Sequence, residues 1–312
     1  RGLNSCTKNL AGPLPDIAVL MDKLGGAKYM TALDLVAGYN QLPMHPDSIE
    51  KTSITTVLGQ FSYIVCPFGI SGLPSFFQSI MNELFGEFAE PDEVQKKYQK
   101  RPGYEGENNP DVPGAMFSTF VANMLDDVLI FSNTFEQHME HVERVLRRFA
   151  DNQLYLNLTK CTFGFPHASY LGQVVGSGTR QADPSKVSAL LNFPSPTTAS
   201  ELRSWLGLGN YVSDYMRDWA RISAVFSEHR GKPKNTRILL SKEQAKAFDE
   251  LRTAIAAAPV LQLPDFSKPF YLETDASKHA IGSCLLQEKE GKLLPVAFRS
   301  VIMSGAQVDW CI

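Results

Sequence analysis

The sequence has little that would place it in a membrane or in an oxidising compartment. It contains no run of about 18 apolar residues, so no membrane span is expected, and no secretory signal is visible at its start. Its five cysteines are scattered, odd in number and without a Cys-x-x-Cys pair. This pattern argues against a disulfide framework or a cysteine zinc site and favours an intracellular protein with reduced thiols.

The chain also lacks a large net charge. The formal charge is −3 over 312 residues, so any nucleic-acid surface would have to be a local patch. Hydrophobic residues make up 44% and charged residues 20% of the chain, which is typical of folded globular proteins with two or three domains at this length. The sequence starts at Arg1 and stops at Ile312 within an apolar run, and we interpret it as part of a longer protein.

Apolar periodicity predicts an α+β region, then a mostly helical region, then a return to strands. Apolar runs near Asp34 and in "FVANMLDDVLIFSN" (Phe120 to Asn133) predict strands. Residues 133–154 predict an amphipathic helix whose apolar face would hold Phe135, Met139, Val142, Val145, Leu146 and Phe149. The segment 89–116 is polar and rich in proline, glycine and asparagine, so we predict a mobile loop or disordered insert there.

Three acidic residues interrupt the apolar strands. Asp34 ends the run "TALD", and Asp126 and Asp127 lie side by side at the predicted tip of a hairpin. If these strands share one sheet, the three carboxylates converge and suit hard cations such as Mg²⁺. Two such ions, with Mn²⁺ as an alternative, would serve phosphoryl transfer. The competing interpretation is an ordinary turn, because aspartate often satisfies its own backbone there.

The order of the motifs resembles the reverse transcriptase of Ty3/gypsy-type LTR retrotransposons. The first catalytic motif of that family is similar to "LGGAKYMTALDLVAGYNQLPM", and its Tyr-x-Asp-Asp motif to "MLDDVLIFS". The segment around the nascent base pair is similar to "KTSITTVLGQFSYIVCPFGI", and the primer grip to "YLGQVVG". The start of the RNase H domain is similar to "AFDELRTAIAAAPVLQLPDFSKPFYLETDAS".

This resemblance implies an α+β right-hand polymerase. Fingers and palm with an antiparallel sheet would span residues 1–177, including the insert 89–116. A helical thumb would span 178–238, and a truncated RNase H-like α/β domain would span 239–312.

The resemblance also implies site residues. Asp34, Asp126 and Asp127 would bind the metal ions, with the backbone carbonyl of Leu35, and Lys160 would protonate the pyrophosphate leaving group. The residues expected to contact dNTP and template are Tyr39, Phe68, Gly69, Gly72 and Gln78, and those of the primer grip are Leu171 and Gly172. An ordinary core tyrosine is the competing interpretation of Tyr39.

Several positions depart from the family pattern. Met124 stands where the family usually has tyrosine, and Gly72-Leu73-Pro74 replaces its Asn-Ala-Pro. The family usually crosses the segment 89–116 in only a few residues. Asp275 resembles the first metal-binding acid of the RNase H domain, but the sequence stops where the next would be expected. We therefore predict no RNase H activity from this chain.

Two charged clusters have competing interpretations. A basic stretch could follow a duplex backbone, although a solvated surface is preferred; it holds Arg217, Arg221, Arg230, Lys232, Lys234 and Arg237. His138 and His141, three residues apart, could suggest a zinc pair. No third ligand is near, and an exposed helix face is preferred.

The expected function is RNA-directed DNA polymerisation. The expected partners are an RNA or DNA template–primer, dNTPs, the rest of a Pol polyprotein and, if the enzyme dimerises, a second copy. The alternative is a decayed or repurposed element that binds nucleic acid or a partner without polymerising. The expected location is intracellular, in a cytoplasmic virus-like particle or the nucleus.

Overall fold

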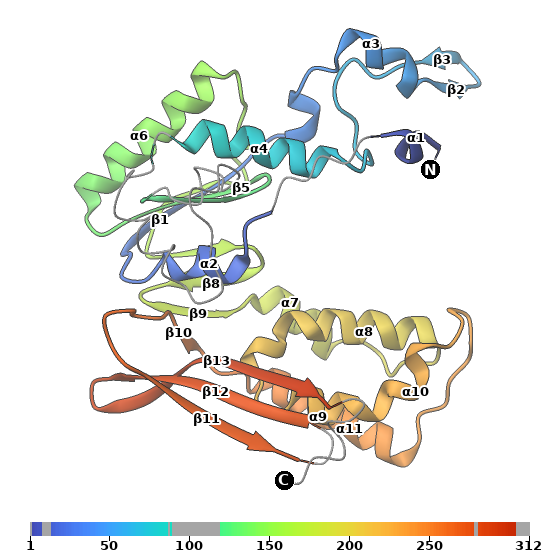
Figure 1. Cartoon of the computed structure of the whole chain (residues 1–312), viewed down its shortest axis with the longest axis vertical. Coiled ribbons are helices and arrows are strands. Elements are labelled where there is room, and N and C mark those ends of the chain that lie inside the picture. The colour runs from blue at the N-terminus through green and yellow to red at the C-terminus, as the bar shows by residue number, and fades with distance from the viewer. Residues whose placement is uncertain (1, 8–13, 87, 89–118, 278–279, 304–312) are drawn as a thin grey trace, which may run out of the picture. The chain divides into compact units, whose positions relative to one another are not determined.

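A computed structural model describes residues 2–7, 14–86, 88, 119–277 and 280–303. The predicted insert at 89–116 lies outside these residues. The chain forms two compact units, Arg1–Leu171 and Gly172–Ile312. The predicted palm-thumb division at 177 therefore falls close to a unit boundary, whereas the predicted thumb and RNase H-like segments share the second unit. Helices and antiparallel sheets occur in both units, as the predicted α+β class requires (Figure 1).

The first unit is built on a four-stranded antiparallel sheet. Its order is β4-β5-β1-β6, with β1 at Tyr29–Asp34, β4 at Val121–Met124, β5 at Asp127–Ser132 and β6 at Thr162–Phe165. Strand β7 (His167–Tyr170) follows and packs against β1. The adjoining short elements are α1 (Gly2–Cys6), α2 (Ile17–Asp22), η1 (Gly38–Gln41), α3 (Pro46–Ile49) and η2 (Glu50–Thr52).

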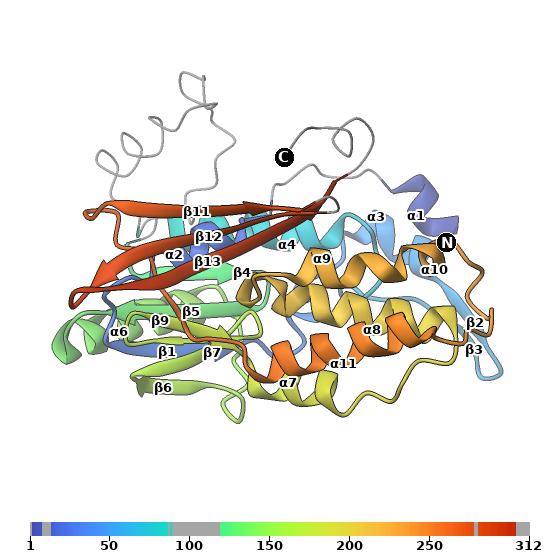
Figure 2. The ribbon, with the colours of Figure 1, turned by 90° about the horizontal axis from the view of Figure 1, so that it is seen from below.

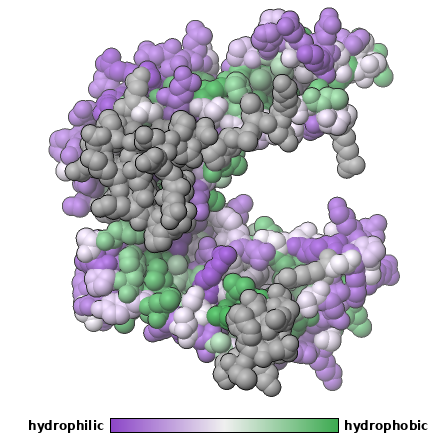
Figure 3. Space-filling model, in the orientation of Figure 1, coloured by the Kyte–Doolittle hydropathy of each residue, from purple (hydrophilic) through white to green (hydrophobic). Residues whose placement is uncertain are grey.

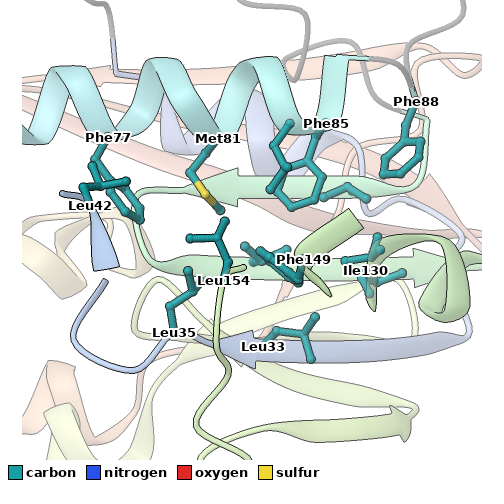
Figure 4. Packing of buried hydrophobic residues seen from close by; sticks show 14 of the residues in the cluster. Leu33, Leu35, Leu42, Phe77, Met81, Phe85, Phe88, Ile130, Phe149 and Leu154 are labelled. Atoms are coloured by element: carbon teal, nitrogen blue, oxygen red, sulfur yellow. The ribbon is translucent and has the colours of Figure 1, made fainter. Parts of the chain in front are cut away.

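Two long helices cover one face of this sheet. Helix α4 (Leu73–Gly86) presents Phe77, Met81 and Phe85 at four-residue spacing, which places them on one helical face. Helix α6 (Phe135–Asp151) begins at Thr134, whose side chain accepts a hydrogen bond from the backbone N–H of Gln137. Figure 4 shows the three apolar side chains of α4 packed with Leu33, Ile130 and Phe149 in a common core.

The predicted apolar face of α6 is confirmed for Val142, Val145, Leu146 and Phe149, which lie in or against the core, and is wrong for the first turns of the helix. Phe135 and Met139 are 51% and 55% exposed, whereas His138 is 1% exposed. His138 is buried because its ring nitrogens meet the hydroxyls of Thr31 (2.7 Å) and Ser132 (3.0 Å) on the sheet. Ser132 also contacts His141 at 2.8 Å. The preferred interpretation of the two histidines as an exposed face is therefore wrong; they anchor α6 to β1 and β5.

A small hairpin projects from the first unit. It consists of β2 (Ile54–Thr56) and β3 (Gly59–Phe61). Its turn residues Val57 and Leu58 are 102% and 85% exposed, and apolar side chains reach the surface at this end of the molecule (Figure 3).

The second unit combines helices with two sets of strands. In the first set, β9 (Thr179–Ala182) pairs antiparallel with β8 (Gln173–Gly176) on one side and with β10 (Leu261–Gln262) on the other. A second antiparallel sheet has the order β11-β12-β13, with β11 at Phe270–Ala276, β12 at Ala280–Lys289 and β13 at Lys292–Ile302 (Figure 2). The helices are α7 (Pro184–Leu191), α8 (Ala199–Val212), η4 (Ser213–Tyr215), α9 (Trp219–Ser223), η5 (Ala224–Phe226), α10 (Ser227–Arg230) and α11 (Lys242–Ala256).

The second unit has its own core. The ring of Trp205 in α8 lies 6.4 Å from that of Trp219 and 4.4 Å from that of Phe248, centroid to centroid. Capping boxes start α8 at Thr198 and α11 at Ser241. Among the described residues of both units, no helix has the length and apolar character that crossing a bilayer requires.

Candidate active site

Strand register brings the three acidic residues together. Asp34 is the last residue of β1 and lies opposite Asp127, the first residue of β5. Asp126 lies in the turn that joins β4 to β5. The sheet therefore ends in three carboxylates contributed by two neighbouring strands and one turn.

The electrostatics of this end of the sheet favour a cation. Loss of surrounding water raises the pKa of the Asp126 carboxyl, and the charges of Asp127 and Asp34 raise it further. Desolvation and Asp34 raise the pKa of Asp127, while Lys160 lowers it. The Asp126 Oδ1 atom is buried and has no hydrogen-bond partner within the described residues. A buried carboxylate oxygen without a donor is costly, and a bound cation would remove that cost.

Lys160 already supplies one positive charge. Its Nζ atom lies 3.5 Å from Asp34 Oδ2, and its side chain is 65% exposed. Residues on both sides of Lys160 hold the backbone of Asp34: the Asn157 N–H donates to the Asp34 carbonyl at 2.8 Å, and the Asp34 N–H donates to Cys161 Sγ at 3.4 Å. Leu35 is 3% exposed and bridges to Leu156. The segment 156–161 thus fixes both Asp34 and its counter-charge.

A glycine makes room for Asp126. Gly38 is buried at the start of η1, and a Cβ atom there would overlap the Asp126 carboxylate. The preceding Ala37 has φ 48° and turns the chain back toward the acids. No residue other than glycine fits this close approach without moving Asp126.

Gln78 holds the turn that carries Asp126. It is 1% exposed; its Oε1 accepts the Leu125 N–H at 2.7 Å, and its Nε2 donates to Asn82 Oδ1 at 2.8 Å. Leu125 needs this support because its φ of 54° is unfavourable for a residue with a branched side chain. Gln78 therefore points inward to the hairpin in this structure, and its predicted contact with nucleotide or template stays a prediction.

An aromatic cluster flanks the acids. The ring of Tyr39 packs edge-on against Phe68 (5.4 Å between centroids) and Phe77 (5.3 Å). Burial raises the pKa of Tyr39, and Asp126 raises it further, so Tyr39 is close to the acidic cluster. Phe68 is 63% exposed and available to a ligand. Gly72 lies directly before α4, where its carbonyl accepts the Phe76 N–H at 3.2 Å.

Asn4 was not predicted as part of this region. Its Nδ2 donates to the Gly69 carbonyl at 2.8 Å, and its Oδ1 accepts the Ser71 N–H at 3.0 Å. Gly69 has φ 97°, a conformation that glycine adopts without strain. Both bonds of one amide thus fix the loop that follows Phe68.

The predicted primer-grip residues form the turn after β7. Leu171 has φ 48° and Gly172 has φ 72°. A Cβ atom at Gly172 would overlap the hydroxyl of Tyr211. The turn lies at the boundary of the two units, so its relation to the acidic residues stays a prediction.

The predicted RNase H residue lies in the second unit. Asp275 is on β11, opposite Gly282, and lines a cavity of about 30 Å³ with Arg217 and Glu273. Arg217 pairs with Glu273 at 2.6 Å. Arg221, from the same basic stretch, lies 3.1 Å from Asp218 and 3.4 Å from Glu250. Two arginines of the basic stretch are thus already paired with acids. This pairing favours a solvated surface over a surface that follows a nucleic-acid backbone.

The residues present suit a divalent ion by chemistry but are not preassembled around one. Within the described ranges, no three histidine, cysteine, aspartate or glutamate side chains lie in positions that would hold a metal. Asp34 faces Lys160 instead. The unsatisfied Asp126 oxygen and the carboxylate donors nevertheless match what Mg²⁺ prefers.

Two family models match the sequence. Residues 1–175 match "Reverse transcriptase (RNA-dependent DNA polymerase)", and residues 240–312 match "RNase H-like domain found in reverse transcriptase".

Among curated proteins, a retrovirus-related Pol polyprotein from transposon 297 of Drosophila melanogaster is 32% identical over 311 residues, which is 99% of this chain and 26% of that protein. The Pol polyprotein from transposon gypsy of the same organism is 30% identical over 92% of this chain and 26% of that protein. The Tf2-3 polyprotein of Schizosaccharomyces pombe is 28% identical over 99% of this chain and 21% of that protein. The chain thus spans about a quarter of the length of these relatives.

Solved structures of the foamy viral protease-reverse transcriptase share the fold. The complex with RNA/DNA hybrid has a TM-score of 0.76 at 19% identity, covering 98% of this chain and 37% of that one. A complex with dsDNA has a TM-score of 0.77 at 19% identity, and the match covers 100% of this chain and 59% of that one. The predicted α+β right-hand polymerase class is confirmed by this likeness.

Proposed function

The chain belongs to the reverse transcriptase family, and from that membership we propose that it catalyses RNA-directed DNA polymerisation. The observation that carries the proposal is the meeting of Asp34, Asp126 and Asp127 at one end of the sheet, with a buried Asp126 oxygen that lacks a partner in the described structure. Such a cluster is unfavourable by itself and is explained by a cationic ligand.

In the proposed reaction, the primer 3′-hydroxyl oxygen bonds to the α-phosphorus of a dNTP while the bond to pyrophosphate breaks. Asp34, Asp126, Asp127 and the Leu35 carbonyl would hold divalent ions, Mg²⁺ or alternatively Mn²⁺. When bound, two such ions lower the pKa of the attacking hydroxyl and neutralise the leaving oxygen. Lys160 is exposed beside Asp34 and would donate a proton from Nζ to the departing pyrophosphate.

The aromatic cluster would bind the incoming nucleotide. Tyr39 is held by Phe77 and lies near Asp126, so its ring can pack beneath a deoxyribose and clash with a 2′-hydroxyl. Phe68 is exposed beside it, and Gly69 lets the backbone approach the substrate. Leu171 and Gly172 would contact the primer.

The proposed partners are a template–primer of RNA or DNA and dNTPs. This is consistent with the foamy viral structures, which are complexes with RNA/DNA hybrid and dsDNA. We also propose two protein partners, the rest of a Pol polyprotein and a second copy of the chain. The proposed location is intracellular, in a virus-like particle or the nucleus.

Primer extension on poly(rA)/oligo(dT) with Mg²⁺ tests the function. The parent chain should incorporate dTTP, and Asp126→Asn should lose at least about 10²-fold in rate, as expected for a group that stabilises charge in the reaction. Asp249→Asn is the matched control, because Asp249 is an exposed residue of α11 in the second unit. It should extend like the parent.

A binding-only element is the second candidate, favoured by Met124 at the position opposite Asp127. A parent chain that binds the RNA/DNA hybrid and synthesises nothing would support this candidate and contradict polymerisation. Cleavage of the hybrid's RNA strand by the chain would contradict the predicted lack of RNase H activity.

A further inference from the structure

Gln41, the last residue of η1, makes three hydrogen bonds that the proposed reaction does not use. Its Nε2 donates to the carbonyl of Val36 at 2.6 Å and to the carbonyl of Tyr155 at 3.0 Å. Its Oε1 accepts the Tyr155 N–H at 2.7 Å, so one side chain joins segments 114 positions apart. A carboxamide offers both the donor and the acceptor that this contact needs, whereas a carboxylate cannot donate and an apolar chain can do neither.

The contact lies at the end of a short antiparallel pairing beside the acidic residues. Residues 34–36 pair with residues 155–157 through two backbone hydrogen bonds, of 3.0 and 2.8 Å, on either side of the bridge between Leu35 and Leu156. A pairing with so few backbone bonds opens readily. Gln41 adds its three bonds at the far end from Asp34 and so holds the pairing closed.

The same pairing determines where Lys160 lies. After residue 157 the chain turns, and the N–H groups of Lys160 and Cys161 donate to the Asn157 carbonyl at 2.9 and 3.2 Å. This turn leaves Lys160 Nζ 3.5 Å from Asp34 Oδ2. The lysine side chain is flexible and 65% exposed, so its approach to Asp34 depends on the backbone that carries it.

We propose that Gln41 is a positioning residue that holds Lys160 beside Asp34 for proton donation to the departing pyrophosphate. This inference rests on the proposed function, which gives Lys160 that role. Gln41 acts through the backbone of residues 155–157 and is not itself a proton donor in the reaction. A general acid must lie within hydrogen-bond reach of the group that it protonates. Loosening the pairing should therefore slow the chemical step more than it weakens dTTP binding.

A double-mutant cycle tests the link between the two residues. Gln41→Met should lower kcat for primer extension at least about tenfold per folded molecule, with a smaller change in KM for dTTP. Lys160→Ala should lower kcat about 10²-fold. In the Lys160→Ala background, Gln41→Met should cost less than about twofold, because the group that it positions is already absent.

Gln137→Met is the matched control and should extend primers like the parent. Gln137 is exposed on α6, and the substitution keeps its backbone N–H, which bonds to Thr134. Equal losses from Gln41→Met in the parent and in the Lys160→Ala background would overturn the inference. They would place the effect in η1, which also carries Gly38 and Tyr39, and not in Lys160. A parent-like kcat in Gln41→Met would overturn it as well.

Hydrogen exchange of the backbone amides of residues 155–161 is a second readout, and it does not depend on synthesis. Gln41→Met should speed exchange at Tyr155 and Asn157, whereas Gln137→Met should not. If the parent fails to extend primers but Gln41→Met opens this segment, the proposed function fails and the hold of Gln41 on the segment stands. If the parent extends primers and exchange in Gln41→Met is unchanged, the role of Gln41 fails alone.

Discussion

Replacing Gln78 by methionine tests how the catalytic turn is held in place. Methionine has a similar length and stays apolar in the core, but it can neither accept from the Leu125 N–H nor donate to Asn82. Two hydrogen bonds of about 1 kcal/mol each are lost. The Leu125 N–H and the Asn82 oxygen also lose their partner in a buried region, which brings the expected destabilisation to about 2–4 kcal/mol. For a unit of this size, each kcal/mol lowers the melting temperature by about 2–4 °C.

The effect on activity should exceed the effect on folding. Leu125 is held at φ 54°, and without the glutamine the turn can relax and displace Asp126 and Asp127. A displacement of about 1 Å at a reacting centre can cost about 10²-fold in rate. We therefore expect kcat for primer extension to fall about 10²-fold per folded molecule, with a smaller change in KM for dTTP.

The assay is steady-state primer extension beside thermal melting, with Ser79→Ala as the matched control. Ser79 is the next residue of α4, is exposed, and only donates to the carbonyl of Phe76 at 2.7 Å. It should leave both measurements nearly unchanged. If Gln78→Met lowers the melting temperature but keeps the parent kcat, the glutamine stabilises the unit without positioning the acids, and the reasoning fails. Parent-like values in both measurements would refute the hydrogen bonds themselves.

Three further predictions follow from the same unit. Gly38→Ala should abolish primer extension while the chain stays folded by circular dichroism, because a Cβ atom would displace the Asp126 carboxylate; parent-like synthesis would contradict this. Burial lowers the pKa of His138 below its ordinary value of about 6.5, so the stability it contributes is complete above that pH and is lost as the pH falls through the lower folded-state pKa. Urea unfolding should show this loss in the parent and a flatter profile in His138→Gln; identical profiles would contradict it. Asn4→Ala should raise KM for dTTP several-fold with little change in kcat, because the loop after Phe68 loses two hydrogen bonds, and an unchanged KM would exclude that role.

The acidic residues could be predicted because their signals are local. A strand pattern on both sides of "LDD" and a second strand ending in Asp34 are enough to bring three carboxylates to one edge. The role of Gln78 also left a signal. Gln78 and Asn82 share the helical face of Phe77 and Met81, and polar residues on a buried face need partners.

Other features have no local signal. Asn4 contacts a loop more than 60 residues away, and nothing in its neighbours indicates this. Phe135 and Met139 at the start of α6 were mispredicted as buried because hydrophobicity alone favours them over His138. The buried position of His138 depends on hydroxyls of Thr31 and Ser132, which are supplied by two other strands. Polar partners from distant segments therefore decided which residue is buried in the first turns of α6.

The close approach of Gly38 to Asp126 also constrains how copies of this gene can lose function. While Asp126 is present, any larger residue at position 38 displaces its carboxylate. Once a smaller side chain replaces Asp126, the restriction on Gly38 disappears. A change at position 38 is therefore enough to stop synthesis by a folded chain whose three acidic residues are all intact, so an inactive copy cannot be recognised from Asp34, Asp126 and Asp127 alone.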